Sequence, residues 1–295
     1  MIDRTRLAEL MAIEEQRFLD AHPKSGELFE SAKLSMPSGV PMSWMSKWPG
    51  AYPVFVEEAK GATFVDVDGN TYIDFCLGDT GSMTGHSPEA TVTAIREQVG
   101  RGLSAMLPTK DAAVVSADLA ARFKLPLWQF TVSATDANRH VIRYSRLITG
   151  KSKIIVIDRC YHGSVDETFA TLDKKGKTVA REGNIGAPVD LDLTTRVVPF
   201  NNLAAMKKAL ANDDVAAILM EPAMTNVGIV LPIDGYLKGV EKLAKEFGAM
   251  LIIDETHTIS VGPGGMTGEL GLAPDFLTIG KAIGGGFPTG AFGMS

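Results

Sequence analysis

Two chemically reactive side chains, Lys281 and Asp254, each follow a short apolar run. The run at 275–280 reads DFLTIG, and the run at 250–253 reads MLII. Runs of this length and composition are typical of buried strands in an α/β sheet. Such sheets bind ligands in the crevice beyond the carboxyl ends of their strands, so the amine and the carboxylate are expected to face one crevice.

An amine opposite a carboxylate suits pyridoxal 5'-phosphate. A lysine forms a Schiff base with this cofactor, and an aspartate keeps the ring nitrogen protonated so that the ring withdraws electrons. The structural alternatives are that Asp254 and Glu255 cap a helix or form ion pairs, and that Lys281 simply begins a helix or loop. Glycines 284–286 could admit a phosphate or only mark a turn.

A possible phosphate site follows the strand expected at 128–132. Ser133, Ala134 and Thr135 open a helix there, and the free N–H groups of a helix start bind anions. The alternative is that Ser133 or Thr135 merely caps the helix.

Two further strand ends carry an aromatic ring and polar groups. Tyr161 could stack on a planar cofactor with His162 hydrogen-bonding nearby, or both could belong to a packed loop. Glu221 and Asn226 could hold a phenolic oxygen or a water, or belong to a solvated turn. The prediction of one site depends on all five strand ends carrying compatible groups.

The order of predicted elements indicates an α/β fold. Helical periodicity and apolar strand-like runs alternate from residue 87 onward, which is typical of a mostly parallel sheet with right-handed crossovers. Residues 1–86 are predicted to form an amino-terminal arm and a small antiparallel lobe, and residues 87–295 a large α/β domain. The expected strands are 128–132, 153–157, 195–198, 215–220, 249–253 and 276–279, with helices at 88–99, 110–123, 135–148, 203–211 and 235–247.

Composition narrows the class of partner. The chain has 295 residues, 45% of them hydrophobic, and a net charge of -6, which argues against nucleic acid or an anionic membrane as the main partner. The two cysteines belong to no spaced set that would suggest zinc or a disulfide framework, so no metal and a reducing, cytoplasmic setting are expected. A small-molecule ligand is the remaining expectation.

Taken together, these residues resemble the class III pyridoxal-phosphate-dependent aminotransferases of fold type I. The branch with glutamate-1-semialdehyde aminomutase and the β-amino-acid aminotransferases is the most similar, over residues 29–295. The set is specific although each member is common. Its carriers are Gly61-Ala62, Asp66–Asn70, Tyr72–Asp74, Gly85–Pro88, Ser133–Asn138, Thr149–Lys151, Tyr161–Gly163, Glu221-Pro222 with Asn226 and Gly228, Asp254-Glu255, and Gly280-Lys281.

The resemblance implies a seven-stranded, mostly parallel sheet with helices on both faces and a small amino-terminal lobe. It also implies that Lys281 carries the cofactor, that Asp254 pairs with the ring nitrogen and that Tyr161 stacks on the ring. These three are the expected catalytic residues.

By the same resemblance, the amides of Ala134 and Thr135 hold the phosphate, and Glu221 and Asn226 lie near the phenolic oxygen. The expected cofactor-binding set is Ser133, Ala134, Thr135, Tyr161, His162, Glu221, Asn226, Asp254, Thr256 and Lys281.

The chain departs from the family pattern in several places. Ala134 and Asp136 replace the usual glycine and glutamate, and Thr256 replaces a valine that packs under the ring. The loop at 37–48 lacks an arginine that some β-amino-acid enzymes have. The sequence stops as the strand at 290–295 begins, so the family's carboxyl-terminal lobe is expected to be absent, either because the chain is a fragment or because it is a natural truncation.

The predicted function is ping-pong transamination between an amino acid or amine and an oxo acid. The alternatives are an aminomutase and a cofactor-binding protein without turnover; a nucleotide-binding domain is remote because no Gly-x-Gly-x-x-Gly motif is present. A homodimer is expected, with segments 77–86 and 36–48 lining the partner's site and with Trp44 and Met45 near the substrate. The alternative is that the tryptophans fold back on their own core.

Overall fold

A computed structural model describes residues 2–186 and 189–295, and its contacts divide the chain into two compact units. The first is Met1–Gly78 with Thr84–Ala94, and the second is Asp79–Met83 with Ile95–Ser295. These units assign residues 79–83 to the second unit and divide helix α3 (Glu89–Val99) between the two, and the single boundary predicted after residue 86 stays a prediction.

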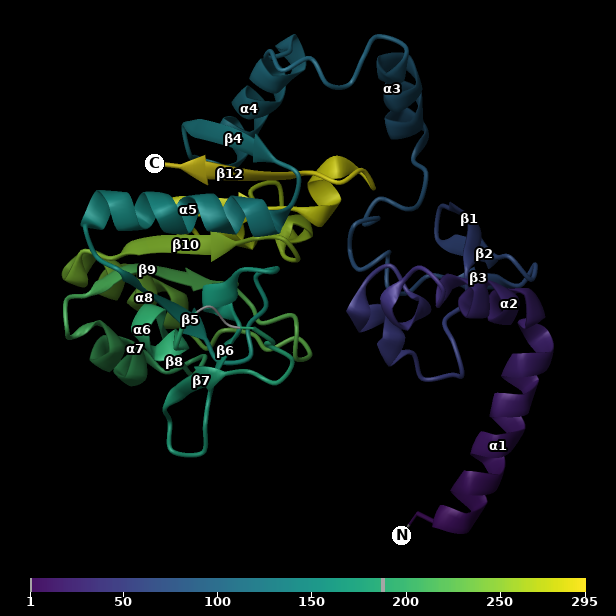
Figure 1. The fold of residues 1–295 in the computed structure, drawn as a ribbon. Coiled ribbons are helices and arrows are strands. Elements are labelled where there is room, and N and C mark those ends of the chain that lie inside the picture. Colours follow the sequence, from purple (N-terminus) through teal and green to yellow (C-terminus); the bar gives the residue numbers. More distant parts are fainter. Residues whose placement is uncertain (1, 187–188) are drawn as a thin grey trace. The chain divides into compact units, whose positions relative to one another are not determined.

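The first unit contains helices α1 and α2, two short 3-10 turns, a small sheet and the first part of α3 (Figure 1). Helix α1 stops at His22 because Pro23 begins the next helix, where its fixed φ and missing N–H are tolerated. The three strands are antiparallel in the order β1-β2-β3, as the alternating pattern predicted. The elements are α1 (Arg4–Ala21), α2 (Pro23–Ala32), η1 (Pro37–Gly39), η2 (Ser43–Lys47), β1 (Val56–Lys60), β2 (Thr63–Asp66) and β3 (Thr71–Ile73).

The second unit is built on a seven-stranded sheet in the order β4-β12-β11-β10-β9-β5-β8. Strand β12 is antiparallel to both of its neighbours, and the other six strands run in one direction. This confirms the predicted mostly parallel α/β sheet. The bounds are β4 (Leu127–Thr131), β5 (Lys153–Ile157), β8 (Thr195–Val198), β9 (Val215–Met220), β10 (Met250–Asp254), β11 (Phe276–Ile279) and β12 (Gly290–Met294).

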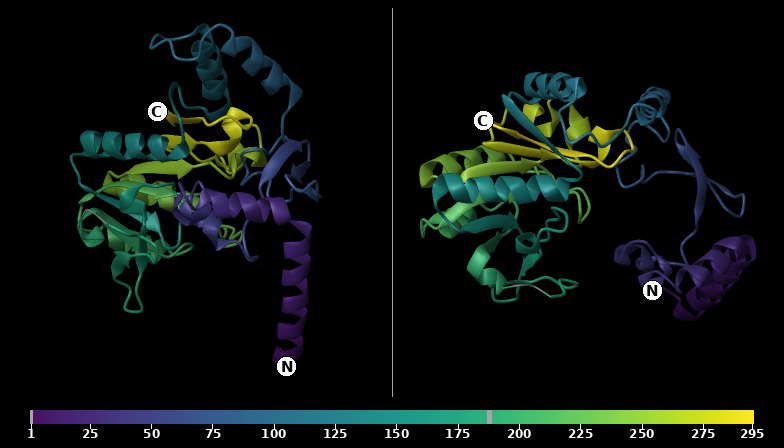
Figure 2. Two further views of the ribbon diagram at one scale, coloured as in Figure 1. Left: turned by 45° about the vertical axis from the view of Figure 1, so that its right-hand side comes forward. Right: turned by 45° about the horizontal axis from the view of Figure 1, so that its top comes forward.

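Helices cover both faces of this sheet (Figures 1 and 2). Helix α5 connects β4 to β5, whereas α7 connects β8 to β9 and α8 connects β9 to β10, which is the opposite direction along the sheet. Since such connections are right-handed, α5 lies on one face of the sheet and α7 and α8 lie on the other. The short hairpin β6–β7 was not predicted from the sequence. The remaining elements are α4 (Lys110–Phe123), α5 (Ala134–Thr149), η3 (Asp166–Thr168), β6 (Ala170–Leu172), β7 (Thr178–Ala180), α6 (Leu191–Thr194), α7 (Leu203–Leu210), α8 (Tyr236–Phe247), η4 (Ile259–Val261), α9 (Gly265–Glu269) and η5 (Lys281–Gly284).

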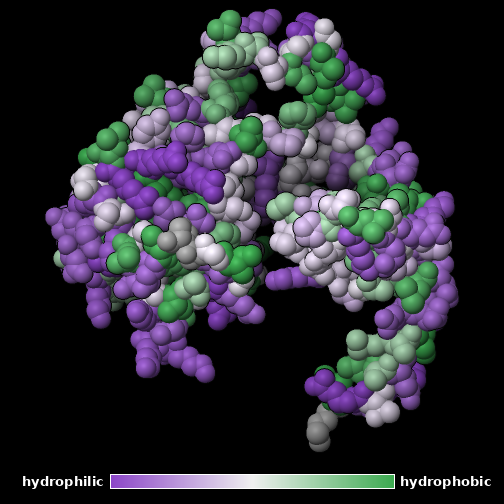
Figure 3. Space-filling model, in the orientation of Figure 1, coloured by the Kyte–Doolittle hydropathy of each residue, from purple (hydrophilic) through white to green (hydrophobic). Residues whose placement is uncertain are grey.

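The core of the second unit lies between the sheet and these helices. Every residue of β9 is buried, because a central parallel strand is covered on both faces and is therefore apolar throughout. On the side of this unit seen in Figure 3, hydrophilic side chains predominate and hydrophobic ones are scattered. Among the described residues, no helix has the length and apolar character that a membrane span requires.

Candidate active site

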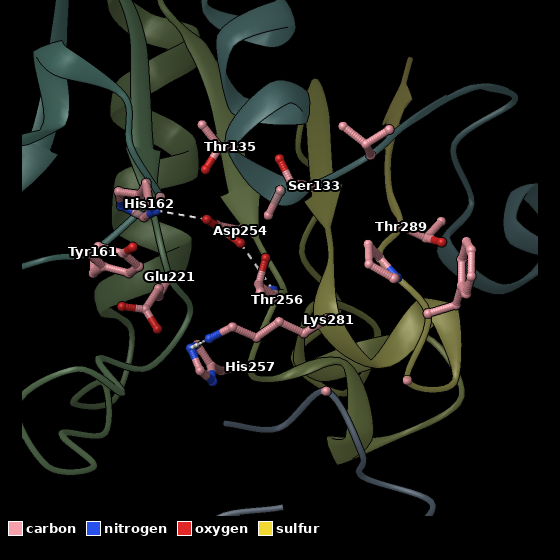
Figure 4. Close-up of a pocket in the computed structure, with 17 residues that line it drawn as sticks. Ser133, Thr135, Tyr161, His162, Glu221, Asp254, Thr256, His257, Lys281 and Thr289 are labelled. Atoms are coloured by element: carbon pink, nitrogen blue, oxygen red, sulfur yellow. Dashed lines mark hydrogen bonds and ion pairs between the residues drawn. The ribbon is translucent and has the colours of Figure 1, made fainter. Parts of the chain in front are cut away.

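A cavity of about 350 Å³ lies at the carboxyl edge of the large sheet. Strands β4, β5, β9, β10 and β11 run in the same direction, so the residues that follow them meet at this edge. The sequence predicted this meeting, and Figure 4 shows these side chains around the cavity. The predicted residues that line it are Ser133, Ala134, Thr135, Tyr161, His162, Glu221, Asp254, Thr256 and Lys281.

Asp254 is buried and held by three hydrogen bonds. Its Oδ2 accepts from Asn138 Nδ2 at 3.0 Å and lies 2.8 Å from His162 Nδ1. Its Oδ1 accepts from the backbone N–H of Thr256 at 3.0 Å. The amide of Asn138 is oriented in turn, because its Oδ1 accepts from Thr278 Oγ1 at 2.8 Å. These contacts fix the carboxylate at the end of β10.

Asp254 and His162 form a buried ion pair. Burial by itself would raise the pKa of Asp254, but the hydrogen bond and charge of His162, together with the bonds from Thr256 and Asn138, lower that pKa to about 2. Burial opposes the charged form of His162, yet its interactions with Cys160 and Asp254 raise its pKa well above the ordinary value. The carboxylate is therefore ionised throughout the neutral pH range.

The start of α5 forms another wall of the cavity. Ser133 Oγ caps the helix by accepting from the N–H of Asp136 at 3.3 Å, as the structural alternative proposed. The N–H groups of Ala134 and Thr135 belong to the first turn and have no acceptor within the helix. A Cβ at Gly280 would lie 2.7 Å from the Cβ of Ala134, so only glycine lets the end of β11 approach this helix start.

The loop after β5 packs closely against Thr135. The hydroxyl of Thr135 accepts from the N–H of Ser164 at 3.1 Å. Gly163 has φ 77°, and a Cβ there would lie 2.0 Å from this hydroxyl oxygen. The loop that carries Tyr161 and His162 therefore depends on a glycine at position 163.

We expect Gly163→Ala to destabilise the chain and disturb the cavity. A left-handed alanine costs about 1–2 kcal/mol, and the overpacking against Thr135 adds about 1–3 kcal/mol. Gly176 is a matched control, since its φ is 76° and a Cβ there would meet nothing within 4 Å. Urea unfolding of both variants measures the loss in the free energy of unfolding. Gly176→Ala should lose only the cost of the left-handed backbone, whereas Gly163→Ala should also lose the cost of overpacking. Equal losses of stability in the two variants would contradict the packing argument.

Three buried polar atoms on the cavity wall have no hydrogen-bond partner among the described residues. They are His162 Nε2, Glu221 Oε1 and Thr256 Oγ1. The other oxygen of Glu221 accepts from the N–H of Thr225 at 3.3 Å, and burial raises the pKa of this carboxyl despite the opposing charge of His162. Buried polar groups without partners are costly, which indicates that a polar ligand pairs with them.

Tyr161 presents its ring at the mouth of the cavity and is 39% exposed. The guanidinium of Arg181 lies 6.0 Å from the ring centroid and donates to the carbonyl oxygen of Cys160 at 2.8 Å. Arg181 therefore packs near the Tyr161 ring, and the exposed part of the ring is accessible to a planar ligand in the cavity.

Lys281 reaches into the cavity from the turn after β11. Its Nζ lies 2.8 Å from His257 Nε2 and 2.9 Å from Asp79 Oδ2. Lys281 itself has φ 46°, an unusual conformation for a residue with a Cβ. Strained backbone of this kind concentrates at functional sites, where the surrounding structure holds it.

Asn226 does not line the cavity, and its predicted place near the cofactor's phenolic oxygen stays a prediction. Its loop closes on itself through isolated bridges between Met224 and Val230 and between Asn226 and Gly228, which leaves Asn226 exposed. Trp44 and Met45 lie in the first unit, where they line a groove of about 430 Å³. Their predicted place near the substrate stays a prediction.

The sequence did not identify three residues that contact Asp254 or Lys281. Asn138 lies on the buried face of α5, and a polar residue at an apolar helical position was the available signal. His257 follows Asp254 by three residues and could have been suspected from that spacing. Asp79 belongs to segment 77–86, which was predicted to line the partner's site, but the sequence did not indicate that it lies beside Lys281 of its own chain.

Comparison with known proteins places this geometry in a family. The family model described as aminotransferase class-III matches residues 44–295. The glutamate-1-semialdehyde 2,1-aminomutase of Methanocaldococcus jannaschii is 37% identical over 274 residues, which cover 91% of this chain and 63% of that protein.

Solved structures agree. A glutamate-1-semialdehyde aminomutase from Pseudomonas aeruginosa is 47% identical with a TM-score of 0.96, covering 100% of this chain and 65% of its own. An omega-transaminase from Sphaerobacter thermophilus is 30% identical with a TM-score of 0.86, covering 92% of this chain and 64% of its own. The chain thus spans less than two thirds of these relatives, and it belongs to the class III aminotransferase family.

Proposed function

We propose that this chain binds pyridoxal 5'-phosphate and transfers amino groups. The observation that carries the proposal is that Lys281 and an ionised Asp254 face one cavity beside the start of α5. Related proteins support it. A lysine-to-alanine variant of the P. aeruginosa protein was crystallised with PMP, the aminated form of the cofactor. A transaminase that is 31% identical to this chain was crystallised with PLP, which is pyridoxal 5'-phosphate.

The residues present fit this cofactor. The free N–H groups of Ala134 and Thr135 suit a phosphate, which helix starts bind through their N–H groups and dipole. The methyl group of Ala134 lies against Gly280, so this departure from the family's glycine is accommodated by the neighbouring strand end. The unpaired Glu221 Oε1 and Thr256 Oγ1 are polar partners for the ring substituents and the substrate.

The chemistry divides between the cofactor and the chain. When bound, pyridoxal phosphate supplies a ring that withdraws electrons from the carbon bearing the amino group. Lys281 would supply the amine that holds the cofactor covalently and that moves a proton at that carbon once it is released. His162 and Asn138 hold the ionised Asp254 in place, where it would pair with the ring nitrogen, and Tyr161 would cover one face of the ring and exclude water.

An aminomutase of the glutamate-1-semialdehyde type is the first candidate within this chemistry. The sequence favoured ping-pong transamination and gave the aminomutase as an alternative, but the sequence relatives and the structure with TM-score 0.96 carry the aminomutase name. Transamination is the second candidate, because the S. thermophilus transaminase shares the fold at 30% identity.

The two candidates differ in whether a free oxo product appears. With glutamate-1-semialdehyde as the only substrate, we expect the cofactor-loaded chain to move the amino group from carbon 2 to carbon 1 without an added amino acceptor. Because the product is an isomer of the substrate with the same mass, NMR or chromatographic separation of the products checks this. An oxo product released in proportion to an added acceptor would favour transamination, and cofactor binding without any reaction would favour a binding protein.

We also propose a homodimer in a cytoplasmic setting. The groove at Trp44 and Met45 has exposed apolar side chains of the kind that gather at protein interfaces, and Trp44 is 59% exposed. The few cysteines agree with a reducing compartment.

A further inference from the structure

We propose that His257 is a positioning residue that holds the amine of Lys281, and that Thr80 holds the His257 ring in place through its other nitrogen. This inference deepens the proposed function and rests on it for its catalytic consequence. Its structural content concerns only residues of this chain.

The contacts form a chain of three side chains from separate segments. Nζ of Lys281, after β11, lies 2.8 Å from Nε2 of His257, after β10. Nδ1 of the same ring lies 3.1 Å from Oγ1 of Thr80. Both ring nitrogens of His257 are therefore engaged, one by the reactive amine and the other by a hydroxyl.

The amine determines which way the ring must be protonated. An ammonium group donates hydrogen bonds and accepts none, so Nε2 of His257 must offer its lone pair. The proton of the neutral ring then lies on Nδ1 and is donated to Thr80, whose hydroxyl can accept it. The hydrogen bond at one nitrogen in this way fixes the role of the other.

The charges around the ring favour its neutral form. Burial and the positive charge of Lys281 lower the pKa of His257, and the carboxylates of Asp79 and Asp254 oppose this shift without reversing it. A neutral imidazole can accept from the amine, whereas an imidazolium would repel it.

The contact between the Lys281 amine and Asp79 holds the amine less firmly than the contact with His257. The side chain of Asp79 is 63% exposed, so solvent screens its attraction for Lys281. Asp79 and Thr80 have φ values of 54° and 66°, a conformation that residues with a Cβ rarely adopt. This loop conformation accompanies the contact between the Thr80 hydroxyl and His257.

The consequence is that a released Lys281 amine has one partly buried neutral acceptor that returns it to a fixed place. Without this acceptor the exposed carboxylate of Asp79 is the one contact left to the amine among the described residues, and the amine samples more positions. Misplacement of a reacting group by about 1 Å can cost about 10²-fold in rate. The loss should appear in kcat rather than in KM.

The structural arm of the test uses cofactor-free protein and long-range ¹⁵N NMR of the imidazole. We expect the His257 ring to be protonated at Nδ1. Thr80→Ser should keep this tautomer and its hydrogen bond, and Thr80→Val should keep the tautomer, because the amine still needs the Nε2 lone pair, but change the Nδ1 chemical shift as its acceptor is lost. Lys281→Met should shift the ring toward protonation at Nε2. Lys281→Met should raise the pKa of His257, because it removes the positive charge. A ring protonated at Nε2 in the wild type, or a His257 pKa unchanged in Lys281→Met, would overturn the proposal.

The catalytic arm compares His257→Gln, which keeps an acceptor, with His257→Leu, which removes it. We expect kcat to fall about 10²-fold in the leucine variant and clearly less in the glutamine variant, with KM little changed in both. His140→Gln, at an exposed histidine of α5, is the control. Equal losses in the two His257 variants, or a loss confined to KM, would overturn the positioning role.

The two arms separate the failure of this inference from the failure of the proposed function. If the wild type transfers no amino groups, the proposed function fails while the NMR results still decide whether the His257 contacts exist. If the wild type is active and the tautomer is wrong, the inference alone fails.

Discussion

Replacing Lys281 with alanine is expected to abolish amino-group transfer and to leave the fold intact. Proton transfer by a positioned side chain alone contributes about 10²–10⁴-fold, and the covalent role of the amine is lost in addition. The side chain is 25% exposed and belongs to a turn rather than to a buried strand, so its truncation leaves no core cavity. Initial rates and a thermal melt by circular dichroism measure the two halves of this result.

Lys242→Ala is the matched control for Lys281, because Lys242 is an exposed lysine on α8. It should retain wild-type rates and stability. Ordinary activity in the Lys281 variant would refute the assigned amine, and a large drop in melting temperature would show that Lys281 has a structural role.

Asp254→Asn is expected to reduce the rate by at least about 10²-fold while the cofactor still binds. Asparagine keeps the shape of the side chain but loses the charge that holds the ring nitrogen protonated, and one preorganised electrostatic contact of this kind is worth about 3 kcal/mol. The amide also has a single acceptor oxygen for three donors, those of His162, Asn138 and Thr256. Turnover measured at saturating cofactor separates the chemical effect from weak binding.

The same variant has a readout that needs no substrate. Asp254 raises the pKa of His162, so that pKa should fall in Asp254→Asn when it is followed by NMR in the cofactor-free protein. Asp234→Asn, at an exposed aspartate, should change neither this pKa nor the rate. An unchanged His162 pKa would mean that the ion pair is weaker than its 2.8 Å contact implies.

Most of the site could be predicted because it follows from strand polarity. Parallel strands end at one edge of the sheet, so the direction of the strands alone brings together the residues at their ends, such as Asp254, Glu221 and Lys281. The fold was predictable for the same reason, since apolar strands alternate with amphipathic helices and leave few topologies.

The sequence is less informative about segments whose path depends on contacts with residues distant in the sequence. Asn226 lies in a loop that closes on itself, and Asp79 reaches Lys281 from a loop 202 positions earlier in the chain. The hairpin β6–β7 has strands of three residues, too short for a periodic pattern. Neither propensity nor spacing encodes these arrangements, because they depend on which tertiary partner the loop finds.

The position of β12 has a consequence for how the sheet can be completed during synthesis. Strand β4 lies at one edge, and its neighbour is β12, which pairs Gly290 with Thr131. A ribosome releases β4 long before β12, so both sides of β4 stay unpaired while the other five strands emerge. Phe130 of β4 and Val132 directly after the strand are exposed even in the finished sheet, so the unpaired β4 is a candidate for binding by chaperones or for aggregation. Insertion of β12 between β4 and β11 completes the pairing of β4, and the long sequence separation between β4 and β12 makes that step slow.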